Sequence, residues 1–117
     1  MKVIRINDIV PQEVKSELFT GPVQVRNLVD TDIARGFRFG LVKFGAGIKN
    51  KYHTHTNEQV LLITEGKGIV ATENEEIVVT PGMLVYIPAG ERHWHGATDD
   101  SSFAHIAISV MPSKTEF

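Results

Sequence analysis

The sequence contains no cysteine. This absence excludes a disulfide framework, a thiolate nucleophile and any metal site built on cysteine ligands. No apolar run approaches the ~20 residues that a membrane-spanning helix needs. Residues 1–8 also lack the apolar core of a secretory signal peptide. We therefore expect a soluble, cytoplasmic protein.

The chain also lacks a block of basic residues. Its 12 lysines and arginines are balanced by 14 aspartates and glutamates, for a net charge of −2. Neither nucleic acid nor an anionic membrane is therefore an expected partner. A length of 117 residues with 42% hydrophobic residues suits one domain with its own core. We expect a single domain over residues 1–117, in which residues 1–20 form an N-terminal arm.

Many short apolar segments separated by turn residues predict an all-β fold. A weak alternation over residues 1–10 suggests an arm strand, and residues 11–18 suggest a short helical turn. Several strands are apolar on both faces, which favours a closed barrel or sandwich covered outside by a second sheet or a partner subunit. The expected strands cover residues 23–29, 36–44, 60–64, 68–72, 77–80, 83–87, 94–97 and 103–110.

The histidines follow a spaced pattern. One motif reads Gly47-x5-His53-x-His55-x3-Gln59-x6-Gly66, and a second reads Gly82-x5-Pro88-x-Gly90-x2-His93. His95 follows the second motif, and His105 lies in the last apolar run. Imidazole is a common ligand of transition metals and a proton carrier near neutral pH. The glycines at 66, 82 and 90 permit positive φ or tight turns at strand ends.

The first candidate site is a metal centre formed by His53, His55, Gln59 and His93. Residues at alternate positions share a face of a strand, as the histidines at 53 and 55 do and those at 93 and 95 do. Side chains from two such neighbouring strands could therefore meet inside a barrel. Three imidazoles and an amide oxygen suit one divalent ion such as manganese, iron, cobalt, nickel or zinc. Glu58 has the opposite parity, although a bulge could turn it inward in place of Gln59. The competing interpretation is that the His53-Thr54-His55 segment is simply a loop.

The two remaining histidines are candidate catalytic residues. His105 and His95 could act as general acid and base beside the metal, or each could be a hydrogen-bonded structural residue. We expect His105 to face inward, because its neighbours at 103, 107 and 109 leave more room than the aliphatic alternate set at 104, 106, 108 and 110. Trp94 alternates away from His93 and His95, which indicates packing on the outer face.

Both motifs resemble those of the cupin superfamily, whose fold is a small jelly-roll β-barrel. The motifs cover residues 47–97, with Gln59 where that family usually has Glu and Ala97 where it often has Asn. The stretches at 53–55, 59–66, 90–97 and 103–108 resemble the bacterial manganese-dependent cupin hydroxynitrile lyases. In those lyases the counterparts of His53, His55, Gln59 and His93 bind the metal. The counterpart of His105 serves as acid/base with that of His95 nearby.

This resemblance implies a lyase that cleaves cyanohydrins to a carbonyl compound and cyanide. A metal-dependent dioxygenase and a non-enzymatic small-molecule-binding module are the alternatives. Cupins that ketonise unsaturated uronates also use Gln as a ligand, but they carry Asp and Arg where this chain has Ile108 and Lys114. The partner is then a small-molecule substrate. Two-sided apolar strands and the arm residues at 3, 4, 6 and 9 also suggest a homodimer.

Overall fold

A computed structural model describes all residues, 1–117, and consists almost entirely of β-strands. Its one helical element is a 3-10 turn, η1, at Ile6–Asp8. No helix has the length and apolar character needed to cross a membrane. The strands are β1 (Gln12–Val14), β2 (Val23–Val29), β3 (Phe37–Phe44), β4 (Thr54–His55), β5 (Gln59–Gly66), β6 (Gly68–Thr72), β7 (Glu76–Val79), β8 (Leu84–Ile87), β9 (His93–Ala97), β10 (Phe103–Val110) and β11 (Thr115–Glu116).

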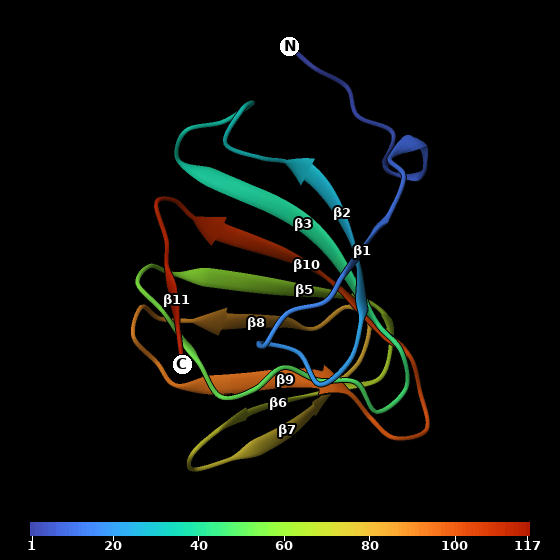
Figure 1. The fold of residues 1–117 in the computed structure, drawn as a ribbon, viewed down its shortest axis with the longest axis vertical. Helices are drawn as coiled ribbons and strands as arrows, with labels where there is room; N and C mark the ends of the chain where they lie inside the picture. Colours follow the sequence, from blue (N-terminus) through green and yellow to red (C-terminus); the bar gives the residue numbers. More distant parts are fainter.

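The strands form two main antiparallel sheets. A six-stranded sheet has the order β1-β2-β3-β10-β5-β8, and a three-stranded sheet has the order β7-β6-β9. A short pair, β11-β4, joins the C-terminal segment to the first histidine motif. Figure 1 shows β9, β6 and β7 below β8, while the N-terminal residues extend beyond β2 and β3. The all-β barrel predicted from the sequence is confirmed.

Most strand predictions agree with the structure to within two residues, and those for β2, β6 and β10 have the observed bounds. The N-terminal predictions are wrong. Residues 1–10 contain the 3-10 turn instead of a strand, and residues 11–18 contain β1 instead of a helical turn. β1 forms because the edge of β2 offers it hydrogen-bond partners and Val14 packs on the core. Neither influence is visible in a three-residue sequence pattern.

The apolar core fills one end of the barrel. Phe44 on β3 and Phe103 on β10 are fully buried cross-strand partners, and Leu61 and Ile63 of β5 lie beside them. Alternate residues of these strands continue along the same inner face. That face becomes polar toward the other end, where Gln59 begins β5. The fold therefore has a packed apolar end and a polar end.

Two turn glycines differ in why a larger residue is excluded: one by backbone conformation alone, the other also by lack of room for a side chain. Gly66 and Gly82 have φ of 73° and 90°, in the left-handed region, as the sequence predicted. A Cβ at Gly66 would overlap the backbone carbonyl of Ser102, whereas a Cβ at Gly82 would meet nothing. Gly66 is therefore required by both conformation and close approach, and Gly82 by conformation alone.

We predict that Gly66→Ala destabilises the protein much more than Gly82→Ala. The Gly82 substitution should lower the free energy of unfolding by about 1–2 kcal/mol, the cost of a left-handed L-residue. The Gly66 substitution should cost about 4 kcal/mol or more, since β5 and the start of β10 must also separate. Urea unfolding of both variants measures this difference. Equal losses for the two variants would contradict it.

Candidate metal centre

Three histidines from two separate segments converge at the polar end of the barrel. His53 and His93 form an isolated β-bridge, each backbone N–H donating to the other residue's carbonyl at 3.0 Å. His55 lies on β4, and its Nε2 is 3.2 Å from Nε2 of His53. Ligand atoms of the three side chains lie within 4.8 Å of one another. The two sequence motifs therefore meet through direct backbone pairing.

The tautomers of these histidines are set by their surroundings. Nδ1 of His53 donates to the carbonyl of Lys51 at 2.6 Å, and Nδ1 of His93 donates to the carbonyl of Glu91 at 2.8 Å. A carbonyl only accepts, so both rings carry the proton on Nδ1 and a lone pair on Nε2. The hydroxyl of Thr115 lies 3.0 Å from Nδ1 of His55 and can accept in the same way. Such partners orient imidazoles for metal binding.

Gln59 faces the histidines, and Glu58 faces away. The side-chain amide of Gln59 donates to Ser109 Oγ at 3.1 Å, while its Oε1 is buried without a partner. The exposed Glu58 carboxylate accepts a hydrogen bond from the hydroxyl of Tyr86. No bulge interrupts the pairing of β5 with β8 at this point. The expected parity of Gln59 and Glu58 is therefore present in the structure.

The donor atoms fit a divalent transition metal. Gln59 Oε1 and His93 Nε2 are buried acceptors with no partner in the protein. Buried polar atoms normally have a partner, and an orphaned pair calls for an ion or a ligand. Three imidazoles and an amide oxygen match the preferences of divalent first-row metals. The assignment of His53, His55, Gln59 and His93 as the ligands stays a prediction that this geometry supports.

Burial keeps the cluster neutral. Desolvation lowers the pKa of His53 and that of His55 to about 4, with nearby His93 adding repulsion. Desolvation also lowers the pKa of His93. At pH 7 all three rings therefore have the uncharged form that binds a metal.

His95 is buried behind this cluster and is held by Asn50. The backbone N–H of His95 donates to Asn50 Oδ1 at 2.7 Å, which turns the amide nitrogen toward His95 Nε2 at 3.1 Å. An amide nitrogen only donates, so His95 accepts at Nε2 and carries its proton on Nδ1. That Nδ1 has no partner in the protein. His95 can therefore offer a proton, while its lone pair is already engaged.

His105 is a buried imidazole with both nitrogens free. It is 1% exposed, points inward from β10 as predicted, and neither ring nitrogen has a hydrogen-bond partner. Its ring lies 4.9 Å from that of His95 and 5.7 Å from that of Phe44. Burial lowers its pKa to about 4, so the ring is neutral at pH 7. His105 is therefore the ring in this cavity that is free to take a proton.

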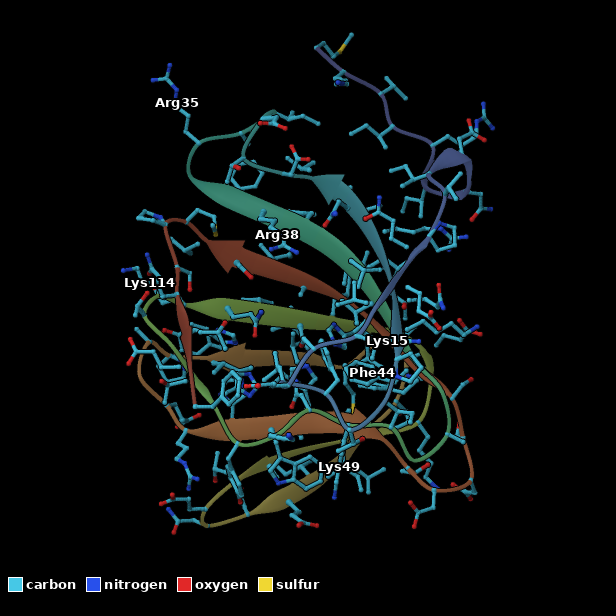
Figure 2. All side chains as sticks on the ribbon, viewed as in Figure 1. Lys15, Arg35, Arg38, Phe44, Lys49 and Lys114 are labelled. Carbon is cyan, nitrogen blue, oxygen red and sulfur yellow. The ribbon has the colours of Figure 1, made fainter.

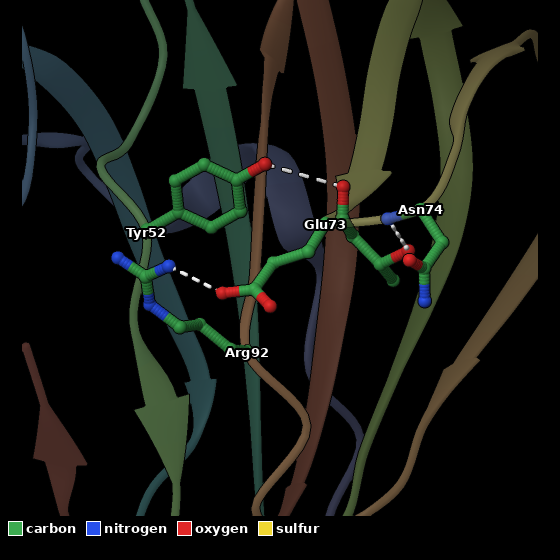
Figure 3. Close-up of polar contacts among 5 residues, drawn as sticks. Tyr52, Glu73, Asn74 and Arg92 are labelled. Carbon is green, nitrogen blue, oxygen red and sulfur yellow. Dashed lines mark hydrogen bonds and ion pairs between the residues drawn. The ribbon is translucent and has the colours of Figure 1, made fainter.

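A polar cluster outside the barrel ties the two ligand-bearing segments together. Tyr52 precedes His53, and Arg92 precedes His93. The Arg92 guanidinium lies 4.5 Å from the centre of the Tyr52 ring and pairs with Glu73 at 2.6 Å. The Tyr52 hydroxyl donates to the carbonyl of Thr72 at 3.2 Å (Figure 3). These contacts anchor both segments to the β6–β7 hairpin.

Trp94 has the outward orientation expected of it. Its ring is half-buried and lies 4.8 Å from Lys49 Nζ on the outer side of β9. Three residues of the site were not anticipated: Asn50, Thr115 and Arg38, which lines the same cavity. Asn50 and Thr115 act through contacts between distant segments, and no local spacing signals them. The inward parity of Arg38 on β3 was a usable signal.

Comparisons with known proteins identify relatives of this chain. The family model of the cupin domain matches residues 40–109. The (R)-mandelonitrile lyase of Granulicella tundricola is 29% identical over 109 residues, which are 92% of this chain and 83% of the lyase. The acireductone dioxygenase of Bacillus mycoides is 26% identical over 122 residues, covering 92% of this chain and 71% of the dioxygenase.

A solved structure, that of a cupin-like protein from Thermotoga maritima, superimposes with a TM-score of 0.81. Its sequence is 31% identical, and the match covers 87% of this chain and 81% of that protein. The architecture and the family resemblance predicted from the sequence are thus both supported by independent relatives.

We predict that the metal-free protein loses stability as the pH falls from about 6.5 to about 4. Unfolded histidines titrate near 6.5, whereas His53, His55 and His105 have folded pKa values of about 4. In this window the unfolded chain binds more protons than the folded chain, so the free energy of unfolding falls as the pH falls. The buried His53 and His105 should make the free energy of unfolding at pH 5 a few kcal/mol lower than at pH 7, as measured by urea unfolding, because one pKa unit corresponds to about 1.4 kcal/mol. The more exposed His55 should add less, because solvent screens its charge. Equal stability at the two values would contradict the prediction.

Proposed function

This chain belongs to the cupin domain family, and on that premise we propose that it is a metal-dependent enzyme acting on a small hydroxy or carbonyl compound. The proposed reaction resembles that of a hydroxynitrile lyase, which cleaves a cyanohydrin to a carbonyl compound and cyanide. One observation carries the proposal. His105, a buried base with two free nitrogens, shares a cavity with the donor atoms of His53, His55 and Gln59.

His53, His55, Gln59 and His93 are the residues we propose to hold one divalent ion, with manganese the expected metal. When bound, the ion supplies a Lewis acid for a substrate oxygen. All four protein ligands are neutral, so no carboxylate weakens that positive charge. Ligand sets of this kind accept several metals, and availability in the cell contributes to the choice.

We assign proton transfer to His105. In the proposed cleavage, the neutral ring takes the proton of the substrate hydroxyl, and the O–H electron pair forms the C=O bond. The carbon–cyanide bond breaks, and cyanide leaves with its electron pair. Return of the proton to cyanide restores the neutral ring. The low pKa of His105 favours this return step, because its charged form is destabilised by burial.

His95 has a supporting role in this proposal. Asn50 occupies its Nε2, so the ring is not available as a base. The centre of the His95 ring lies 4.9 Å from the centre of the His105 ring, and the two ring planes make an angle of 78°. The Nδ1–H group of His95 has no partner in the protein. His95 therefore limits how the His105 ring can turn and adds a hydrogen-bond donor to the cavity.

A metal-dependent dioxygenase is the second candidate, because relatives over 92% of this chain include an acireductone dioxygenase. Three imidazoles and an oxygen ligand also suit dioxygen chemistry with iron, manganese or nickel. Oxygen consumption on phenolic or dicarbonyl substrates separates the two reactions. A non-enzymatic binding module would leave His105 without a role, and turnover measurements test that reading.

We predict that His105→Ala and His105→Phe retain the metal but lose at least about a hundredfold in kcat, the contribution of a general acid/base. The phenylalanine variant keeps the ring volume, so its loss separates proton transfer from packing. Elemental analysis gives the metal content, and release of the carbonyl product from a cyanohydrin gives the rate above the spontaneous reaction.

His53→Ala is the matched control and should lose both metal and turnover. Full turnover by His105→Phe would remove His105 from the mechanism. A wild-type protein that never binds metal would remove the enzymatic proposal itself.

We also propose that the chain forms a homodimer through the outer face of its six-stranded sheet. Leu62, Leu84 and Tyr86 on this face are 37%, 62% and 55% exposed, and Leu62 and Leu84 are direct cross-strand partners. Contiguous exposed apolar surface of this kind marks interaction sites. The arm residues Val3 and Ile6 are also exposed and could add to the contact, as the sequence suggested for the apolar set at 3, 4, 6 and 9.

We predict a solution mass of about twice 13.0 kDa for the wild type and a single-chain mass for Leu84→Glu. The introduced charge would be buried without a partner in the interface. Light scattering after size-exclusion chromatography measures both masses. Val78→Glu, at a 50% exposed position on β7, is the control and should stay dimeric. A wild type with the mass of one chain would refute the dimer.

A further inference from the structure

Arg38 is an exposed residue that lines the cavity of His53, His55 and Gln59 and brings a permanent positive charge to it. It lies on β3 directly opposite Ser109 of β10, which lies opposite Gln59 of β5. Residues paired in this way point to the same face of a sheet, so the three side chains form one inward row. Two strand spacings, about 10 Å, separate the backbones of Arg38 and Gln59. Figure 2 shows Arg38 on β3 beside β10.

No carboxylate of the protein forms an ion pair with this arginine. No aspartate or glutamate lines the cavity, and Arg38 forms none of the four ion pairs of the chain. Its one side-chain partner is the neutral amide oxygen of Asn27 at 3.4 Å, close to the limit for a hydrogen bond. The proposed ligands are neutral as well, so a divalent ion would add to the positive potential. An anion is the species that such a cavity favours.

The inner face between Arg38 and His105 is left open by small side chains. Gly40 and Ala107 are cross-strand partners between the Arg38 row and the His105 row. Gly40 has no positive φ, and a Cβ there would meet nothing closer than 3.9 Å. The backbone therefore does not require glycine at this position, and its absence of a side chain gives room in the cavity. The cavity volume of about 220 Å³ suits a molecule of few heavy atoms.

We propose that Arg38 is a specificity residue that binds the carboxylate of the substrate. The substrate class is then a small 2-hydroxy or 2-oxo acid, with its carboxylate at the guanidinium and its hydroxyl or carbonyl oxygen at the histidine cluster. A guanidinium offers a fork of N–H donors that matches a carboxylate in two parallel hydrogen bonds. This proposal rests on the proposed function for the location of the reacting oxygen.

The test compares two probes of nearly equal size, lactate and its neutral amide lactamide. Zn²⁺-loaded protein is titrated calorimetrically with each probe for wild type, Arg38→Gln and Arg35→Gln. We expect wild type to prefer lactate, and Arg38→Gln to reduce that preference by about tenfold to a hundredfold, the range for a charged hydrogen-bonded contact. Arg35 is exposed on the β2–β3 loop outside the cavity, so Arg35→Gln makes the same charge change and should keep the preference.

Three results would overturn the assignment: no lactate binding by wild type, equal binding of lactate and lactamide, or an unchanged preference in Arg38→Gln. Repeating the titrations with metal-free protein separates this inference from the proposed function. Preference through Arg38 with no turnover of any hydroxy compound would leave the anion site standing and remove the catalytic proposal. Metal-dependent turnover with no role for Arg38 would support the catalytic proposal and remove the anion site.

Discussion

The pairing of β10 with both β3 and β5 is the constraint on which the cavity depends. This strand lies between the other two, and its register decides which side chains of all three point inward. His105 and Ser109 come from β10, Gln59 from β5 and Arg38 from β3. A slip of one residue would exchange this set for the mostly apolar side chains of the outer face. The irregularity in the pairing with β5 falls between Ala104 and His105, so the register from His105 onward is uninterrupted.

The second constraint is the loss of hydration of five imidazoles within one small barrel. Each ring is kept neutral by burial. Backbone carbonyls bind Nδ1 of His53 and of His93, which leaves the Nε2 lone pairs of both rings for the candidate metal centre. Unpaired buried polar atoms lower the free energy of unfolding, whereas buried apolar side chains at the same positions would not. The packed end around Phe44 and Phe103 offsets this cost through apolar burial. Stability and chemistry are thus divided between the two ends of the same strands.

Sequence reasoning succeeded where a feature depends on local spacing. The period of two placed Gln59 inside and Glu58 outside, and it turned His105 inward, because strand alternation is a local property. The left-handed glycines were predictable for the same reason. β1, β4 and β11 were missed because strands of two or three residues form only when a distant segment supplies their hydrogen bonds. Asn50 and Thr115 followed the same rule, since each acts on a histidine that lies far away in the sequence.

The ligand set and Arg38 together bear on the choice among reactions. A carboxylate ligand would lower the charge of the centre and weaken its hold on an anionic substrate. As a ligand, Gln59 would supply oxygen without charge, which would strengthen that hold and leave Arg38 without a competing anion. A neutral cyanohydrin gains from the Lewis acid and from His105 but makes no use of the guanidinium. A hydroxy or oxo acid would use all three, and its carboxylate would orient the reacting carbon before proton transfer begins. In the function we propose, the charge balance of the cavity would therefore select among substrates that the metal and the base would both accept.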